Sequence, residues 1–592
     1  MDIFSLLSLI GGLSLFLYGM TIMGDGLVQL SGGSLKRILG RMTGNRLTAL
    51  LLGTLVTAVI QSSSATTVMV VGCVNSGIMT LSQAVGVIMG ANIGTTVTSW
   101  ILSLTGITGS SVFIRLLKPS SFTPVLALIG IISLMTSKEG SRKKDIGTVL
   151  LGFAVLMTGM ETMSSSVSPL SKDPGFTSLL TAFSHPILGL MAGAILTAII
   201  QSSSASVGIL QALCITGAVT YGTAIPIIMG QNIGTCITAI LSSIGANRSA
   251  KRASLIHLYF NLIGTLLFMI VFYSLNSFLH FGFLANSANA AGIAVIHSCF
   301  NIGSAAVLFP FANQLVRLAT LTIPEKAEKT EPEPERPASL AALDERFLET
   351  PALAMQLCKS AVDDMANLSR KAFQTGMDVL AGYDESRANN VIAMEQEADQ
   401  FEDILGTYLV KLSRKDLTQE DSRLLSLMLH CISDFERISD HAINIVESAQ
   451  ELHRKGLSFT DTSRAELAVF SRTLSDILDL TSTTFVTLDL NLARGVEPLE
   501  EVVDSLRSEI KQRHIERLRG GNCSMEAGLI LEDILTNYER VSDHCSNVAV
   551  ALIELRRDEF DTHEYLDITV KGNDPWFQKE YARLRQLYAL PA

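Results

Sequence analysis

Long apolar stretches fill the chain from its start to about position 320, with only short polar segments between them. Nine of these stretches are long enough to approach or span a bilayer. The backbone of a segment in lipid must satisfy its own hydrogen bonds, so each stretch is predicted to be helical. They fall at about 4–28, 48–77, 81–104, 121–136, 145–165, 186–218, 222–244, 253–277 and 291–317.

A different pattern follows. From about residue 340 to residue 560, apolar positions recur with the period of an amphipathic helix, and turn signals divide the region into six helices. Proline and glutamate dominate residues 321–339, which predicts an extended linker. Residues 561–592 are left as a C-terminal tail. The predicted fold class is therefore all-α, with a polytopic membrane domain at 1–320 and a soluble helical domain at 340–560.

The membrane region contains an internal duplication. The word Gln-Ser-Ser-Ser-Ala begins at Gln61 and again at Gln201, and the word Gly-x-Asn-Ile-Gly-Thr begins at Gly90 and again at Gly230. The pair Gly-Met that begins at Gly19 recurs at the same offset as both words. A fixed offset indicates two repeats, at about 1–140 and 141–280, with an extra helix at 291–317.

Charge divides the chain in the same way. Of the 592 residues, the first 320 carry 15 Lys and Arg against 6 Asp and Glu, whereas the remainder carries 30 against 50. The acidic second half has the wrong sign for binding a phosphate backbone, so the sequence disfavours a nucleic-acid partner. The nearly uncharged first half predicts a lipid bilayer as its surroundings.

Basic loops predict the orientation in the membrane. Lys and Arg gather after the first helix, between the repeats and before the eighth apolar stretch, and such loops stay on the cytoplasmic side. The N-terminus is then outside and the C-terminal domain is cytoplasmic. The two repeats become inverted copies, which requires one of the segments carrying the two repeated words to be re-entrant or broken in each repeat. Inverted repeats with broken helices are typical of transporters, with a channel as the alternative.

The repeated words also suggest chemistry. Serine hydroxyls, amides and the freed backbone N–H groups of a broken helix suit a small anion, whereas freed carbonyls and hydroxyl oxygens suit a hard monovalent cation. Tight packing of small residues is the alternative explanation of the serines. Within the apolar segments, Glu161 either tunes cation binding or lies at the interface. The word His-x-x-Phe-Asn, at His257 and His297, predicts either a proton relay or hydrogen-bonded packing.

Four blocks in this order and spacing resemble the paired signatures of the type II sodium-dependent phosphate cotransporter family, over about residues 5–320. The resemblance implies that the two Gln-Ser-Ser-Ser segments meet at the centre and bind phosphate and sodium ions. The halves differ after the shared word, with Thr66-Thr67 against Ser206-Val207, so unequal contributions are expected. The implied substrate and ion ligands, with their supporting residues, are Gln61, Ser62, Ser63, Ser64, Asn92, Thr95, Gln201, Ser202, Ser203, Ser204, Asn232 and Thr235.

The soluble region contains pairs of carboxylates four residues apart, which places each pair on one helix face. Such pairs are usually solvated, but two pairs in each of two equivalent bundles could form a site for a divalent metal or iron. The region is similar to PhoU, a phosphate-signalling regulator built from two three-helix bundles. Asn537 stands in the second bundle at the position that Asp434 occupies in the first, which predicts a weaker second metal site. The implied metal ligands are Glu395, Asp399, Glu436, Asp440, Glu500, Asp504, Glu539 and Asp543.

Taken together, these features predict a sodium-coupled secondary transporter in the bacterial inner membrane that imports inorganic phosphate, with sodium as coupling ion and a cytoplasmic PhoU-like regulatory domain. An exporter of the same fold and a membrane-anchored signalling regulator are the alternatives. No complete catalytic motif occurs in the sequence, so an enzyme is not expected. The sequence leaves open a homo-oligomer and phosphate-signalling partners.

Overall fold

A computed structural model of the chain is largely helical, and the residues that it describes contain no β-strand. These residues are 3–39, 45–107, 116, 118–137, 141–169, 178, 182–214, 216–324, 337–415, 417–554 and 574–591, with 31–39 described by their backbone alone. The all-α prediction is therefore confirmed.

The described helices form two compact units. The first contains the described residues up to 324 together with Asp344–Leu353, and the second contains residues 337–343 and the described residues from Ala354 onward. Asp344–Leu353 therefore packs with the first unit, although it lies within the range predicted for the second domain.

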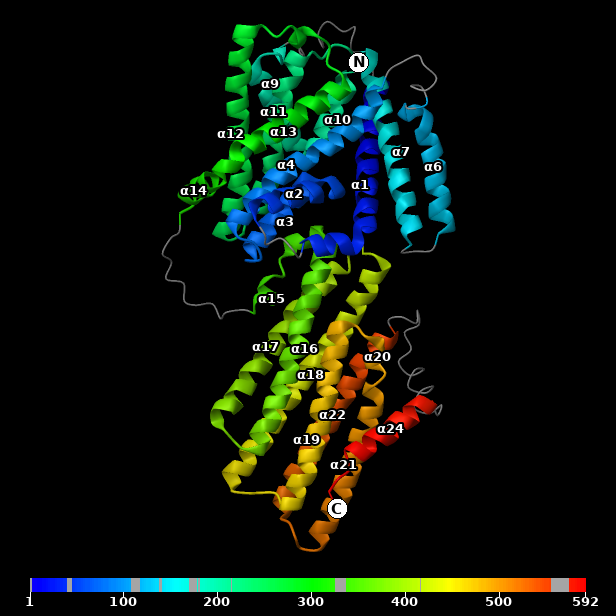
Figure 1. The fold of residues 1–592 in the computed structure, drawn as a ribbon, viewed down its shortest axis with the longest axis vertical. Coiled ribbons are helices and arrows are strands. Elements are labelled where there is room, and N and C mark those ends of the chain that lie inside the picture. Colours follow the sequence, from blue (N-terminus) through cyan, green and yellow to red (C-terminus); the bar gives the residue numbers. More distant parts are fainter. Residues whose placement is uncertain are drawn as a thin grey trace. The chain divides into compact units, whose positions relative to one another are not determined.

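Apolar helices dominate the first unit. Among the described residues, seven are long and apolar enough to cross a membrane, and four shorter apolar helices accompany them (Figure 1). The long helices are α1 (Ile3–Leu39), α4 (Leu81–Ser103), α6 (Pro119–Thr136), α7 (Arg142–Val167), α11 (Tyr221–Ser242), α12 (Arg248–Leu279) and α13 (Ala290–Leu308), which continues through η4 (Phe309–Phe311) into α14 (Ala312–Thr322). The short helices are α2 (Arg46–Ile60), α3 (Ser63–Asn75), α9 (Pro186–Ile200) and α10 (Ser203–Cys214), and short turns occur at η1 (Leu104–Gly106), η3 (Gly282–Ala285) and η5 (Glu345–Glu349).

Glycines let α2 and α4 touch through their backbones. A Cβ atom on Gly90 would lie 2.0 Å from the carbonyl oxygen of Leu50, and one on Gly94 would lie 2.6 Å from that of Thr54. Residue numbers rise together along the two helices from one contact to the next, so α2 and α4 run in the same direction. The chain between two parallel neighbours must turn back, and therefore α2 and α3 form a re-entrant hairpin.

The second repeat has the same arrangement in α9, α10 and α11. A Cβ atom on Gly230 would lie 2.0 Å from the carbonyl oxygen of Leu190, and one on Gly234 would lie 2.4 Å from that of Ala194. These contacts are the equivalents of those in the first repeat, so α9 and α11 are parallel and α10 returns between them. The predicted interruption of one segment in each repeat is confirmed as a hairpin in both.

The two hairpins enter the unit from opposite ends. The base of the first meets the start of α12, because the backbone N–H of Asn247 donates to the Asn75 side chain (2.9 Å). The base of the second meets the chain beyond the other end of α12, because the N–H of Tyr221 donates to the Asn286 carbonyl (3.1 Å). A helix of 32 residues is about 48 Å long. The hairpin tips therefore point towards each other from opposite faces of the unit.

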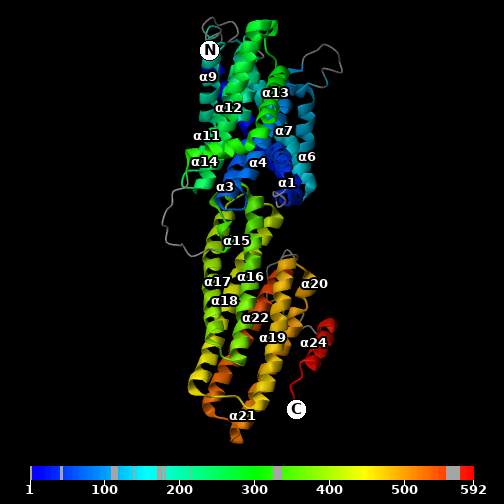
Figure 2. The same cartoon turned by 60° about the vertical axis from the view of Figure 1, so that its left-hand side comes forward.

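Helices α1 and α7, the first of each repeat, pack side by side in both views (Figures 1 and 2). A Cβ atom on Gly12 would lie 3.1 Å from the carbonyl oxygen of Gly159, and one on Gly19 would lie 2.8 Å from that of Gly152. Residue numbers rise along one helix as they fall along the other, so equivalent helices of the two repeats are antiparallel.

Substituting Gly90 by alanine tests the α2–α4 contact. The added methyl group would overlap the backbone of Leu50, so the two helices would have to move apart. Overpacking of this kind costs about 1–3 kcal/mol, so the purified variant should melt at a lower temperature. Gly11→Ala is the matched control, because a Cβ atom there meets nothing within 4 Å. Equal melting temperatures for the two variants would contradict the close packing.

The described part of the second unit contains six long helices, as the sequence predicts. They are α16 (Pro351–Ala381), whose first turn belongs to the first unit, α17 (Glu385–Leu412), α18 (Gln419–Lys455), α19 (Asp461–Thr487), α21 (Val496–Arg519) and α22 (Met525–Glu554). Two short helices, α15 (Ala338–Ala341) and α20 (Leu490–Ala493), also occur, and α24 (Pro575–Leu587), within the predicted tail, packs against α21. The equivalent helices α18 and α22 pack against each other at the centre.

Candidate functional site

Both hairpins turn at a glutamine with the same unusual backbone. Gln61 and Gln201 each have φ 59° and ψ 20°, which is the left-handed region. A residue with a side chain costs about 1–3 kcal/mol in such a sparsely populated region and persists there only when its surroundings fix it. The same conformation at two equivalent positions indicates that the breaks are functional parts of the fold.

A serine begins the helix after each break. The Ser62 hydroxyl accepts a hydrogen bond from the N–H of Ala65 (3.1 Å), and the Ser202 hydroxyl accepts one from the N–H of Ala205 (3.2 Å). Each serine thus caps a helix whose first N–H groups have no partner within the helix. The N-termini of α3 and α10 carry partial positive charge inside the apolar unit, which suits an anion.

The next serines have hydroxyls without hydrogen bonds to the described residues. Ser63, Ser203 and Ser204 are buried, and Ser64 is half-buried. Four hydroxyls without such partners at two helix starts are not required by packing. The arrangement leaves them available to a polar ligand.

The two breaks are not identical in detail. Gln61 is buried and its Oε1 accepts a hydrogen bond from the Thr98 hydroxyl (2.9 Å), whereas Gln201 is exposed. Behind the first break, the Thr57 hydroxyl donates to the hydroxyl of Thr66 (3.0 Å). The equivalent hydroxyls, those of Thr197 and Ser206, are buried and have no partner among the described residues. The polar contacts of the two breaks therefore differ, and unequal contributions to binding stay a prediction.

The supporting residues lie on α4 and α11. Asn92 and Asn232 each donate a side-chain hydrogen bond to a carbonyl four residues earlier in the same helix, and Thr95 and Thr235 do the same. All four are buried. Both α3 and α10 pack against both α4 and α11. The four helices that carry the predicted ligands thus share one core.

Gln231 was not predicted as a site residue. It is 1% exposed, and neither polar atom of its side chain has a partner among the described residues. The sequence held a signal, because Gln231 replaces Ala91 in an otherwise repeated word. A buried amide without partners in this helix is a further candidate ligand.

The other apolar-segment candidates lie elsewhere. Glu161 is exposed, and so it is not among the buried groups of the breaks. His297 is buried, and its Nδ1 lies 2.7 Å from the Ser99 hydroxyl oxygen on α4, as expected for hydrogen-bonded packing between helices. His257 is also buried, and its Nδ1 has no partner among the described residues.

Two clusters of three carboxylates occur among the described residues of the second unit. In each, one oxygen per residue lies within 4.8 Å of the others, a spacing at which one hard cation could contact all three. One comes from α17 and α18, and the other from α21 and α22. Their members are Glu395, Asp399 and Asp440, and Glu500, Asp504 and Asp543.

Burial and mutual repulsion raise the pKa of these carboxyls. Burial and the nearby carboxylates Glu497 and Asp504 raise the pKa of Glu500 to about 9. The pKa of Asp543 rises to about 6, through burial and then through Glu539. In the first cluster, burial and neighbouring acids raise the pKa of Glu395. A bound cation would relieve this repulsion, so the donor set fits a hard metal ion.

Two predicted ligands stand outside the clusters. Glu436 lies 3.6 Å from Arg437, and burial and then Asp440 raise its pKa to about 7. The Glu539 carboxylate is paired with Arg507. Each of these acids nevertheless lies near a cluster member, Glu436 beside Asp440 and Glu539 beside Asp543. Their role as ligands stays a prediction.

The difference between Asp434 and Asn537 does not bear on the clusters. His544 Nδ1 lies 2.9 Å from Asp434, and His441 Nδ1 lies 2.8 Å from Asn537. These contacts cross between α18 and α22 and stand in equivalent positions. The inference that Asn537 weakens the second metal site is therefore not supported, because the residue belongs to the contact between the two helices.

The chain matches two family models, one in each unit, and each model matches twice. The Na+/Pi-cotransporter family model matches residues 15–166 and again 156–290. The PhoU domain model matches residues 362–449 and 467–552. The doubled matches correspond to the duplication in each part of the chain.

Similar proteins are named for phosphate transport and its regulation. YjbB from Salmonella typhimurium, a protein named for inorganic phosphate export, is 25% identical over 570 residues, which cover 95% of this chain and 100% of YjbB. Human sodium-dependent phosphate transport protein 2B is 35% identical over 130 residues, covering 20% of this chain and 19% of that protein. Among solved structures, the regulatory protein PhoU from Streptococcus pneumoniae aligns with a TM-score of 0.33 at 18% identity, covering 36% of this chain and 99% of that one.

Proposed function

We propose that the two hairpin tips bind inorganic phosphate together with sodium ions and import the phosphate. The chain belongs to the Na+/Pi-cotransporter family and carries a PhoU-like domain. The observation that carries this proposal is the pair of equivalent helix breaks, each followed by buried serines whose hydroxyls make no hydrogen bond to the described residues. The family supports phosphate as the substrate.

The chemistry of the tips supports sodium as a partner of phosphate. No Lys or Arg occurs in the segments around Gln61 and Gln201, so the positive charge beside a phosphate must come from elsewhere. Helix N-termini supply part of it, and sodium ions bound by hydroxyl and carbonyl oxygens supply the rest. Hairpins from opposite ends of the unit would open alternately as the repeats rock.

Uptake of radiolabelled phosphate into proteoliposomes tests the coupling. An inward sodium gradient should drive accumulation, and replacing sodium by choline should reduce it at least tenfold. A sodium ionophore, which dissipates the gradient, provides the control. Accumulation that is equal in choline and sodium would contradict sodium coupling.

Export is a second candidate, because similarity to YjbB extends over 95% of this chain. The same vesicles distinguish a sodium-independent exporter from a sodium symporter. An exporter that does not use sodium would release preloaded phosphate equally fast in either cation. A sodium symporter would release it only when sodium is present inside.

For the second unit we propose that each carboxylate cluster binds one divalent cation or iron. Glu395, Asp399 and Asp440 offer three oxygens at a suitable spacing, as do their equivalents. The basic loops support a cytoplasmic position for this unit, with the N-terminus outside. Cysteine labelling from either side of sealed vesicles would test that orientation.

A further inference from the structure

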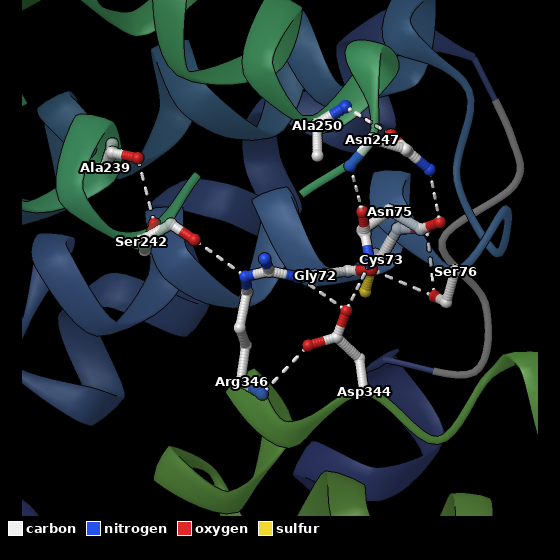
Figure 3. A network of polar contacts seen from close by, with 10 residues as sticks. All are labelled: Gly72, Cys73, Asn75, Ser76, Ala239, Ser242, Asn247, Ala250, Asp344 and Arg346. Carbon is white, nitrogen blue, oxygen red and sulfur yellow. Dashed lines mark hydrogen bonds and ion pairs between the residues drawn. The ribbon is translucent and has the colours of Figure 1, made fainter. Parts of the chain in front are cut away.

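A short segment before α16 is anchored on the first unit (Figure 3). It comprises Asp344–Thr350 and includes the turn η5. Asp344 begins the turn, and its carboxylate accepts a hydrogen bond from the backbone N–H of Arg346 (2.9 Å). The Arg346 guanidinium also pairs with that carboxylate at 2.6 Å. The segment is thus locally rigid, and we call it the clamp.

The clamp holds the end of α3. The Asn75 side chain, at the last residue of α3, donates to the Asp344 carboxylate (2.6 Å). Phe347 is fully buried, and its ring fills the space beside Gly72, where a Cβ atom would come within 2.9 Å of it. Helix α3 begins at the break of the first repeat. The clamp is therefore attached to the arm of the first hairpin.

The same clamp also holds the second repeat. Arg346 Nε donates to the carbonyl of Ser242 (2.7 Å), the last residue of α11. That helix carries Asn232 and Thr235. Asn75 further joins the start of α12, since the Asn247 side chain donates to its carbonyl oxygen (2.7 Å). One continuous network thus ties the ends of a hairpin arm from one repeat and a long helix from the other (Figure 3).

We propose that this clamp restrains the movement of the two repeats, and that its release speeds transport. The proposal rests on the proposed transport function, because alternating access requires one repeat to move against the other, and a bridge between their ends opposes such movement. Pro351 begins α16 directly after the clamp, and α16 continues into the second unit. The clamp is therefore a covalent path by which a change in that unit can reach the transport unit.

Two substitutions release the clamp. Arg346→Ala removes the bonds to Ser242 and Asp344, and Asp344→Asn weakens the contacts to Arg346 and Asn75. Each should raise the initial rate of phosphate uptake by at least threefold. The combined variant should be no faster than the faster single variant, because both act on one network. Arg464→Ala, which removes an exposed arginine paired with Asp461 in the second unit, is the matched control and should transport at the unmodified rate.

A reversible cross-link tests the opposite change, in which the clamp is fixed instead of released. In an Asn75→Cys and Asp344→Cys variant, a short bis-methanethiosulfonate reagent should form a disulfide with each new cysteine, with release of methanesulfinate. The cross-link should lower the uptake rate at least tenfold, and reduction should restore it. The single variant Asn75→Cys, treated alike, should be unaffected. An unchanged rate after complete cross-linking, or no acceleration in Arg346→Ala, would overturn the proposal.

Hydrogen–deuterium exchange distinguishes failure of the clamp proposal from failure of the proposed transport function. The amides of Asp344–Thr350 should exchange faster in Arg346→Ala than in the unmodified protein, whether or not phosphate is carried. Absence of phosphate transport by the unmodified protein would refute the proposed function. Normal transport with no effect of release or cross-linking would refute the clamp alone.

Discussion

Replacing Ser63 by alanine should lower phosphate uptake by about 10- to 100-fold, because a hydrogen bond to a charged group contributes about 1.5–3 kcal/mol. Ser63 is buried at the first turn of α3, and its hydroxyl makes no hydrogen bond to the described residues. Its loss therefore removes a ligand contact without breaking a contact within the fold. Uptake and equilibrium binding of phosphate, measured on the same preparation, would report the effect.

The equivalent Ser203→Ala should also reduce uptake, and the ratio of the two effects measures how unequally the repeats contribute. Ser14→Ala provides the control, since the Ser14 hydroxyl bonds only to the carbonyl of Ile10 in its own helix. Full activity in both Ser63→Ala and Ser203→Ala would show that the serines serve packing alone.

Replacing Glu500 by glutamine should raise the melting temperature of the second unit in the metal-free protein at pH 8. The pKa of this carboxyl is about 9 in the folded chain and 4.5 without its surroundings. Its stabilising contribution is therefore complete below pH 4.5 and is lost as the pH rises towards 9. Glutamine stays neutral, so the difference from the unmodified protein should grow from pH 5 to pH 8. Each 1 kcal/mol recovered moves the midpoint by about 2–4 °C.

Adding Mn²⁺ should reverse the order of the two proteins. The cation stabilises the unmodified protein by binding its folded form, whereas Glu500→Gln lacks one ligand of the second cluster and should respond less. Glu526→Gln, at an exposed position on α22, is the control and should follow the unmodified protein throughout. If Glu500→Gln melts at the same temperature as the unmodified protein at pH 8, the carboxyl is solvated and the cluster is not a strained site.

Much of the fold could be predicted from local sequence. The apolar stretches located the helices, the fixed offset between the repeated words located the repeats, and charge in the loops required an interruption near Gln61 and Gln201. Periodicity could not say whether that interruption was a kink or a hairpin. The answer depends on glycines such as Gly90, whose partner Leu50 lies on a different helix, and one sequence does not show such contacts.

The candidate site could be predicted only in part, because some of its contacts also join residues that are distant in the sequence. Repetition of a polar word in an apolar run marked the serines, since unpaired hydroxyls are costly in lipid. Gln231 was missed because the prediction rested on residues that are identical in the two repeats, and Gln231 differs from its equivalent Ala91. The clamp was missed because Asp344 and Arg346 look like ordinary surface charges, and their partners Asn75 and Ser242 are polar residues at distant helix ends.

The contact between α1 and α7 is self-complementary. Gly12 and Gly19 meet Gly159 and Gly152, and in the second repeat Gly152 is the equivalent of Gly12 and Gly159 that of Gly19. In such an interface both partners use the same surface patch, and identical subunits form dimers through interfaces of this kind. A half-length ancestor could therefore have assembled with a second, oppositely inserted copy through this glycine-lined face, before gene fusion made the pair permanent.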